Sequence, residues 1–233
     1  MTSRLNSLVT LDNGTLVFLD ANILAKPVTR TLLMLGASRS GFRVVWSAMA
    51  EEEALRHMRP RMTSPAVVRE TYGGTLTPTG EVGDRFSATS PADRQILADT
   101  AQSGASFLVT EDVDDFAETD LIGVGVSAVN PDLFLSIRLT RDAYAFVIET
   151  LEKTRSNPRR TAAELHAGIA QQHPRLFSAH ADLYDVEPAT SAHAVPTVIF
   201  RGTRCLSCET TVAQPGELID GLCTDCRRAR NRA

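Results

Sequence analysis

The sequence predicts an α/β fold in which a parallel sheet is flanked by helices. Short runs of strand-forming residues alternate along the chain with longer segments whose apolar residues recur at helical spacing. This alternation is typical of parallel sheets, because parallel strands need long crossover connections between them. The chain has 233 residues, of which 43% are hydrophobic. It therefore has room for one large domain, or for a medium domain with a small appendage.

Five short segments have the composition of strands. The first begins at Leu16 and lies between the turn-forming pair Asn13-Gly14 and Asp20. The others are similarly rich in branched or aromatic residues, and the last follows a stretch rich in Ala, Ser and Thr that is typical of a linker. The expected strands cover residues 16–19, 42–46, 107–110, 122–126 and 195–201.

Helices are expected between and after these strands, and serine or proline marks several of their starts. Ser47, Ser64 and Ser90 have the character of N-caps, and Pro91 suits the first helical position after Ser90. Residues 73–87 contain four glycines and no long apolar run, so we expect a loop there. The expected helices cover residues 27–36, 48–58, 65–72, 91–103, 130–139, 142–153 and 161–172.

The formal net charge of −4 argues against a protein that coats nucleic acid nonspecifically, although it allows a local basic groove. The first residues, Met1 to Arg4, are not followed by an apolar signal segment, and no run approaches membrane-spanning length. We therefore expect a cytoplasmic protein with no membrane partner.

Acidic residues stand where expected strands end or expected helices begin. They are Asp20, Glu53, Asp93, Asp112 and Asp115. In an open parallel sheet, ligands bind beyond the carboxyl ends of the strands, so these side chains can meet in one crevice. Clustered carboxylates repel one another until a cation neutralises them, and oxygen ligands suit Mg²⁺ or Mn²⁺. The pattern predicts a metal-dependent enzyme, although each acid taken alone is also explained as a helix cap or turn residue.

The order and spacing of these segments resemble the PIN-domain ribonucleases, including the VapC-like toxins of toxin–antitoxin pairs. The resemblance covers roughly residues 15–138. No single segment is specific to the family, whereas the combination is. The matching segments are residues 18–24 (FLDANIL), Trp46-Ser47 with Glu53 six residues after Ser47, residues 93–98 (DRQILA), residues 109–116 (VTEDVDDF) and residues 129–135 (VNPDLFL).

The resemblance implies roles for individual residues. The metal-binding acids would be Asp20, Glu53, Asp93 and Asp112, with Asp115 as a further site acid or a support for Asp112. Asn22, Ser47 and Thr110 would orient carboxylates through hydrogen bonds. Glu53 is preferred for its spacing from Ser47, and Glu52 is the alternative. Relatives often carry another acid where this chain has Ser90, so both one and two catalytic metals stay open.

The implied reaction is hydrolysis of RNA phosphodiester bonds by a Mg²⁺- or Mn²⁺-dependent endoribonuclease, which leaves 5′-phosphate and 3′-hydroxyl ends. The resemblance makes RNA the substrate and adds an antitoxin protein and a second copy of the chain as candidate partners. A toxin role and a role in RNA processing both fit this activity. The competing interpretation is a non-catalytic RNA- or protein-binding module that has retained the PIN fold.

All four cysteines lie near the C-terminus as two Cys-x-x-Cys pairs separated by fourteen residues: Cys205, Cys208, Cys223 and Cys226. Two such pairs can place four thiolates around one Zn²⁺, as in a zinc ribbon, and such closed sites are usually structural. The alternatives are a redox dithiol and an iron–sulfur cluster. We expect neither pair to lie at a strand-to-helix start of the thioredoxin kind, which favours zinc.

These features divide the chain into four parts: a PIN-like nuclease domain at residues 1–140, a C-terminal helical extension at 141–187, a linker with a short strand at 188–200, and a zinc ribbon with a basic tail at 201–233. The last part carries six arginines against four acids, hence a formal charge of +2 and −6 for the rest. The basic tail is interpreted either as an RNA-contact surface or as a solvated C-terminus.

Overall fold

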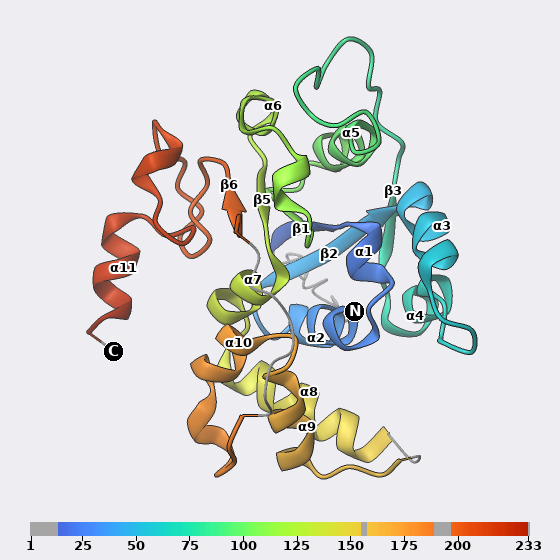
Figure 1. The fold of residues 1–233 in the computed structure, drawn as a ribbon, viewed down its shortest axis with the longest axis vertical. Coiled ribbons are helices and arrows are strands. Elements are labelled where there is room, and N and C mark those ends of the chain that lie inside the picture. Colours follow the sequence, from blue (N-terminus) through green and yellow to red (C-terminus); the bar gives the residue numbers. More distant parts are fainter. Residues whose placement is uncertain (1–13, 155–157, 189–196, 233) are drawn as a thin grey trace, which may run out of the picture.

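The computed structural model describes residues 14–154, 158–188 and 197–232. Its centre is one six-stranded sheet in the order β3-β2-β1-β4-β5-β6 (Figure 1). The first five strands are parallel to their neighbours, and the last is antiparallel to the fifth. The expected α/β class, a largely parallel sheet flanked by helices, is therefore confirmed.

The central strand is β1, which is paired on both sides. Val17 lies opposite Val44 of the second strand and Phe107 of the fourth. Val17, Phe18 and Leu19 are completely buried, as suits a strand covered on both faces. The strands are β1 (Thr15–Leu19), β2 (Phe42–Ser47), β3 (Thr75–Thr77), β4 (Phe107–Val109), β5 (Ser127–Val129) and β6 (Phe200–Arg201).

Helices cover both sides of the sheet. In Figure 1, α2, α8 and α9 lie below the strands, α5 and α6 lie above them, and α3 and α4 lie near β3. The helices are α1 (Ala21–Leu24), α2 (Pro27–Ala37), α3 (Ala48–His57), α4 (Pro65–Tyr72), α5 (Arg94–Ser103), α6 (Glu118–Val124), α7 (Pro131–Arg138), α8 (Arg141–Thr154), α9 (Ala162–Ile169), α10 (Pro174–Ala179) and α11 (Thr224–Arg230), with short 3-10 turns η1 (Val113–Asp115), η2 (Ala181–Leu183) and η3 (Pro215–Glu217).

The strand expected at residues 122–126 is wrong. This run spans the end of α6, where Gly125 adopts a positive φ of 70° and terminates the helix, and the strand begins two residues later. A short apolar run cannot distinguish a helix end from a strand, and here a buried Leu121 anchors the helical alternative.

Three other boundaries differ from expectation. The helix expected from Pro91 begins at Arg94, because the amides of Asp93 and Arg94 both donate to the Ser90 carbonyl and form a turn first. The expected loop at 73–87 contributes the edge strand β3. The helix expected over residues 161–172 ends at Ile169, and a further helix, α10, follows it.

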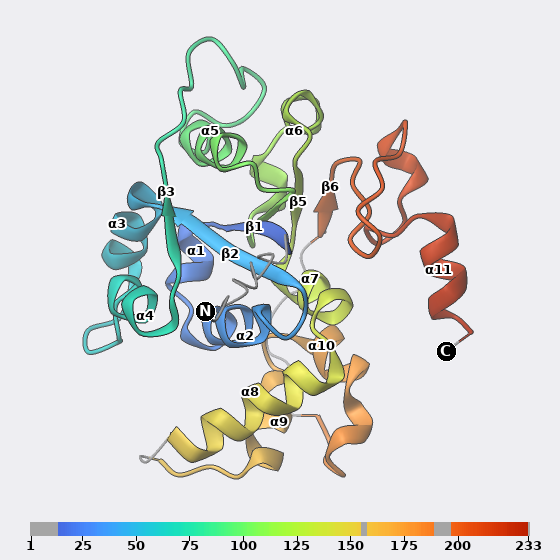
Figure 2. The same cartoon turned by 180° about the vertical axis from the view of Figure 1, so that it is seen from behind.

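The four-cysteine segment continues directly from the sheet. Strand β6 pairs with β5, and Gly202 follows it with a φ of 128°. A Cβ at Gly202 would lie 2.4 Å from the Ser127 hydroxyl oxygen, so only glycine fits this approach. Figure 2 shows the segment beside β6 at the edge of the molecule. Within the expected linker and short strand at 188–200, residues 189–196 lie outside the described part of the chain.

Candidate functional site

Asp20 lies at the carboxyl end of the central strand. Its amide donates to the Val109 carbonyl at 3.1 Å, which places it beside the end of β4. It is also the N-cap of α1, and its Oδ1 accepts from the Ala21 amide at 2.6 Å. Asp20 is only 7% exposed, so its carboxylate is held at the base of the site rather than in solvent.

Thr110 and Asn22 connect Asp20 to Asp112. The Thr110 hydroxyl donates to Asp20 Oδ2 at 2.7 Å and accepts from the Asp112 amide at 3.1 Å. Asn22 Nδ2 lies 3.0 Å from Asp20 Oδ2 and 3.0 Å from Asp112 Oδ2. Two polar side chains, Asn22 and Thr110, thus hydrogen-bond two carboxylates that are 92 residues apart in the chain.

The acids lie close enough to affect one another's pKa values, although only Asp20 among them is buried. Burial raises the pKa of Asp20 to about 7, and the charges of Asp93 and Glu53 add to the increase. The pKa of Asp93 is also raised, chiefly by burial and then by Asp115, Glu53 and Asp112. The pKa of Asp115 is raised by burial and by Asp112. A bound cation would stabilise the ionised form of each.

The three consecutive glutamates of α3 have different environments. Glu51 is buried, where it accepts from Trp46 Nε1 at 2.8 Å and pairs with Arg69 at 3.1 Å. Glu52 is exposed, and Glu53 lines the cleft described below. Helical rotation therefore directs one of the three acids to the core, one to solvent and one to the cleft.

Ser47 does not take the expected role. Its buried hydroxyl accepts from the Ala50 amide at 3.2 Å and caps α3, so it supports the helix that carries Glu53 and orients no carboxylate. By contrast, the Ser90 side chain hydrogen-bonds to Asp93 and lowers the pKa of that carboxyl against the larger effect of burial. Of these two serines, Ser90 therefore contacts an acid of the site and Ser47 does not.

These acids open into one large cleft with a volume of about 1670 Å³. Asp20, Glu53, Asp93 and Asp112 line it, whereas Asp115 does not and lies near the site through its charge alone. The cleft extends along α7 and α10 as far as α11 of the four-cysteine segment. A polymeric ligand that reaches the acids can therefore also contact the C-terminal segment.

The donor set at the acids fits Mg²⁺ or Mn²⁺, because it consists of carboxylate oxygens around a buried carboxylate of raised pKa. The acids are not a closed cage. Among the described residues, the four cysteines are the only group of three or more potential ligands whose donor atoms lie within 4.8 Å of one another. Wider spacing suits Mg²⁺, which usually keeps several waters and binds phosphate oxygens beside one or two carboxylates.

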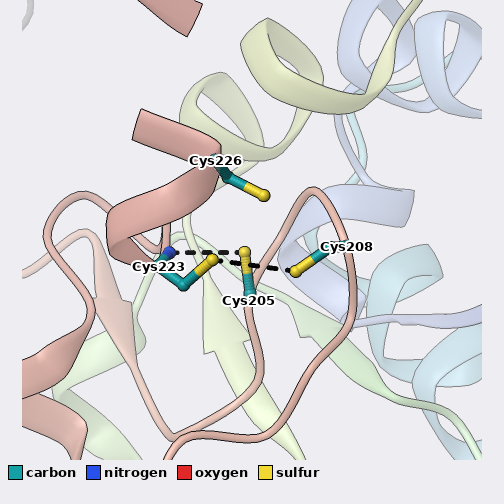
Figure 3. A group of neighbouring side chains, drawn as sticks. All are labelled: Cys205, Cys208, Cys223 and Cys226. Carbon is teal, nitrogen blue, oxygen red and sulfur yellow. Dashed lines mark hydrogen bonds between the residues drawn. The ribbon is translucent and has the colours of Figure 1, made fainter. Parts of the chain in front are cut away.

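The cysteines form a second, compact site (Figure 3). The sulfurs of Cys205, Cys208, Cys223 and Cys226 lie within 4.8 Å of one another. Cys208 and Cys223 are 3.8 Å apart, and a tetrahedral site with Zn–S bonds of about 2.3 Å separates its sulfurs by about 3.8 Å. The Cys223 amide also donates to Cys205 Sγ at 3.4 Å. This geometry is compatible with zinc.

The second cysteine pair lies at a helix start, a position that favours redox dithiols, because Cys223 is the N-cap of α11. No strand leads into this helix, since Leu222 forms only an isolated bridge with Ile219. The pair is nevertheless closed off by Cys205 and Cys208, which approach from a loop bridged at Arg204 and Thr211. Four converging sulfurs match a metal site better than a two-cysteine redox centre.

Two arginines that the sequence analysis did not single out attach the cysteine segment to the sheet. Arg138 of α7 donates to the Leu206 carbonyl at 3.2 Å and to Glu209 at 3.1 Å. Arg201 of β6 donates to the carbonyls of Asp114 and Phe116, both at 2.9 Å. The contacts of Arg201 fix the turn that carries Asp112 and Asp115. No spacing rule in the sequence pairs an arginine with backbone carbonyls almost ninety residues away.

Among the described residues, no helix is long and apolar enough to cross a membrane. Comparisons with protein families, with curated proteins and with solved structures found no match for this chain.

Proposed function

We propose that this chain is a metal-dependent endoribonuclease of the PIN type. The observation that carries the proposal is the network in which Thr110 and Asn22 join buried Asp20 to Asp112 at the floor of a large cleft. Glu53 and Asp93 line the same cleft, in the family's order along the chain. Burial and the neighbouring acids disfavour the ionised form of Asp20, and a bound cation would stabilise it.

The residues divide the work in a simple way. Mg²⁺ or Mn²⁺ bound there would supply a low-pKa water and polarise a phosphate oxygen. Asp20, Glu53, Asp93 and Asp112 would hold the cation, while Thr110 and Asn22 hold Asp20 and Asp112 in place. Asp115 would support Asp112 from outside the cleft. Hydrolysis on this pattern leaves 5′-phosphate and 3′-hydroxyl ends.

The cysteine site has a separate role in this proposal. Zn²⁺ bound by the four thiolates would be structural, because four protein ligands leave no open position for a substrate. It would hold a segment that is too short to build its own core. The iron–sulfur alternative is tested by elemental analysis of purified protein, which would show iron and acid-labile sulfide in place of zinc.

The test is cleavage of RNA with Mg²⁺ or Mn²⁺, with mapping of the product ends. Asp20→Asn and Asp93→Asn should each reduce cleavage on the order of 10³-fold, because each removes several kcal/mol of charge stabilisation. Glu53→Gln and Glu52→Gln form a matched pair on one helix. We expect loss of cleavage for Glu53→Gln and wild-type cleavage for Glu52→Gln.

The competing function is a non-catalytic module that binds RNA or protein. It would be favoured if folded wild-type protein cleaves no RNA and titrating Mn²⁺ produces no binding signal that Asp20→Asn removes. A neighbouring reading frame for an antitoxin-like protein would favour the toxin role over RNA processing. Co-purification with that protein, and the mass of the particle in solution, test the antitoxin and homodimer proposals.

A further inference from the structure

The cleft has a second wall, in which three arginines lie beside two acids. The arginines are Arg175 in α10, and Arg227 and Arg230 in α11, at the end away from Asp20. The acids are Asp132, which accepts from the Arg175 amide at 3.0 Å, and Asp220. The arginines belong to the helical extension and to the four-cysteine segment, outside the part of the chain that resembles a nuclease. The wall therefore needs an explanation that is separate from metal binding at the acids.

The guanidinium groups of this wall are available to a ligand. Among the described residues, none of the three arginines takes part in an ion pair. Arg230 uses one nitrogen to donate to the Ser136 carbonyl at 3.2 Å, which ties α11 to α7. Arg227 Nε is buried without a hydrogen-bond partner. Lys26, in the same cleft, differs because it is paired with Glu111.

Arg227 is partly buried, whereas Arg175 and Arg230 are exposed. Each guanidinium can donate two parallel hydrogen bonds from its planar fork to the oxygens of one phosphate. Among the described lining residues there is no Phe, Tyr or Trp on which a base could stack. The chemistry of the wall therefore fits a sugar–phosphate backbone, and it gives little basis for recognising unstacked bases.

The wall is held rigidly enough to act together with the acids. Strand β6 adds to the main sheet, and Arg138 joins α7 to the first cysteine loop through the Leu206 carbonyl. Cys223 is the N-cap of α11 and Cys226 lies in its first turn, so the cysteine cluster sets the position of the arginines in this helix. In Figures 1 and 2 this segment lies alongside the edge of the sheet formed by β5 and β6.

We propose that Arg175, Arg227 and Arg230 form a backbone-binding track that holds RNA through its phosphates while a distant phosphodiester lies at the acids. This inference rests on the proposed nuclease function, because the acids decide where the strand is cut. Recognition through phosphates makes affinity depend on salt and vary little with base sequence among unstructured RNAs of one length.

The test measures binding rather than cleavage. Full-length Asp20→Asn protein is titrated with labelled, unstructured RNA at several salt concentrations, with and without the double substitution Arg175→Gln/Arg227→Gln. Losing two phosphate contacts should weaken binding about tenfold or more and reduce the slope of log K against log salt by about 1.4, at about 0.7 per contact for a single strand.

Matched variants separate the track from general charge. Arg228→Gln/Arg232→Gln removes the same charge from the same end of the chain, but these exposed residues do not line the cleft. This pair should change the slope far less than Arg175→Gln/Arg227→Gln. Arg175→Lys/Arg227→Lys keeps the charge and should retain most of the slope. Zinc content and circular dichroism show whether each variant is folded.

The outcomes distinguish this inference from the proposed function. Equal loss of affinity in the two double Gln variants would overturn the track, as would an unchanged salt slope or a parent protein that binds no RNA. If the parent protein binds no RNA, the wall would instead be a candidate surface for a protein partner. A wild-type protein that cleaves no RNA, but whose RNA binding depends on Arg175 and Arg227, would remove the nuclease function and keep the binding surface.

Discussion

The two candidate metal sites differ in how their donors are held. The acids come from segments spread over residues 20–112, and the sheet brings them together without closing them into a cage. The cysteines come from 22 consecutive residues and already converge to within 4.8 Å. An open oxygen site leaves positions for water and phosphate, whereas a closed thiolate site leaves none. On the proposed function, the open site would serve chemistry and the closed site would serve folding.

The sites also differ in what supports them. Asp20 is surrounded by the core, next to completely buried Leu19 and Val109. The cysteine segment has few buried apolar residues of its own, chiefly Leu206, with Leu218 and Leu222 nearly so. We therefore expect the acids to keep their arrangement without metal, and the cysteines to lose theirs.

The largest expected effect is the removal of zinc. Structural zinc sites contribute on the order of 10 kcal/mol at neutral pH, more than this segment could recover from its own packing. Chelation, or Cys223→Ser, should unfold the segment from Gly202 onward while β1 to β5 stay folded. Hydrogen exchange by mass spectrometry should show rapid exchange in α11 and unchanged protection in β1.

Arg228→Gln is the control for this comparison, because it alters α11 at an exposed position and leaves all four sulfurs. It should keep one zinc per chain and normal protection. Full protection of α11 after chelation would show that the segment folds without metal and would remove the contrast between the two sites.

The second expected effect is that the two sites respond to pH in opposite directions. Asp20 keeps its proton up to about pH 7 in the folded protein but releases it near 3.8 when unfolded. Without added divalent metal, Asp20 therefore stabilises the wild type relative to Asp20→Asn most strongly below pH 4, and this advantage is lost as the pH rises through 7. Three pKa units correspond to about 4 kcal/mol. Zinc binding responds in the other direction, because protons compete for thiolates.

Urea unfolding across this pH range measures the difference in the free energy of unfolding between wild-type and Asp20→Asn protein. Other titrating groups affect both proteins alike, so their contributions cancel in this difference. Added Mg²⁺ should stabilise the wild type above pH 7 and leave Asp20→Asn unchanged. A difference between the two proteins that does not vary with pH would mean that Asp20 is ionised and satisfied without a cation.

The sequence was sufficient to place the central residues of both sites. Asp20 and Asp112 could be placed together because each follows a predicted strand, and those strands proved to be neighbours, β1 and β4. The roles of Asn22 and Thr110 were expected only from the resemblance to PIN-domain ribonucleases. Four clustered cysteines were equally readable, since their spacing alone defines the site.

Other features depended on rotation and long-range docking, which local patterns do not encode. The position of Glu53 rather than Glu52 on the cleft is set by how α3 packs through buried Ala50 and Ala54. The end of α6 was mistaken for a strand because Gly125 stops the helix within an apolar run. Arg201 gave no signal, because its partners are backbone carbonyls of a distant turn.

The smallest effect concerns the link between the sites. Arg201 holds the turn that carries Asp112 and Asp115 through the carbonyls of Asp114 and Phe116. Arg201→Gln removes this support without touching a metal ligand, so cleavage should fall about tenfold, the lower range for loss of an outer partner at a metal site. The loss should appear as a weaker Mn²⁺ activation curve, with KM for RNA little changed.

Arg204→Gln is the matched control, because Arg204 donates to the Glu209 carbonyl within the cysteine segment and does not contact the turn. Arg201→Lys should recover part of the activity, since it can still donate to one carbonyl. If Arg201→Gln keeps the wild-type Mn²⁺ response, the cysteine segment acts on the acids only through the RNA that both contact. If the Mn²⁺ response weakens as expected, the contact of Arg201 in β6 with the turn helps to hold Asp112 in place, and the cysteine segment thereby supports the acidic site.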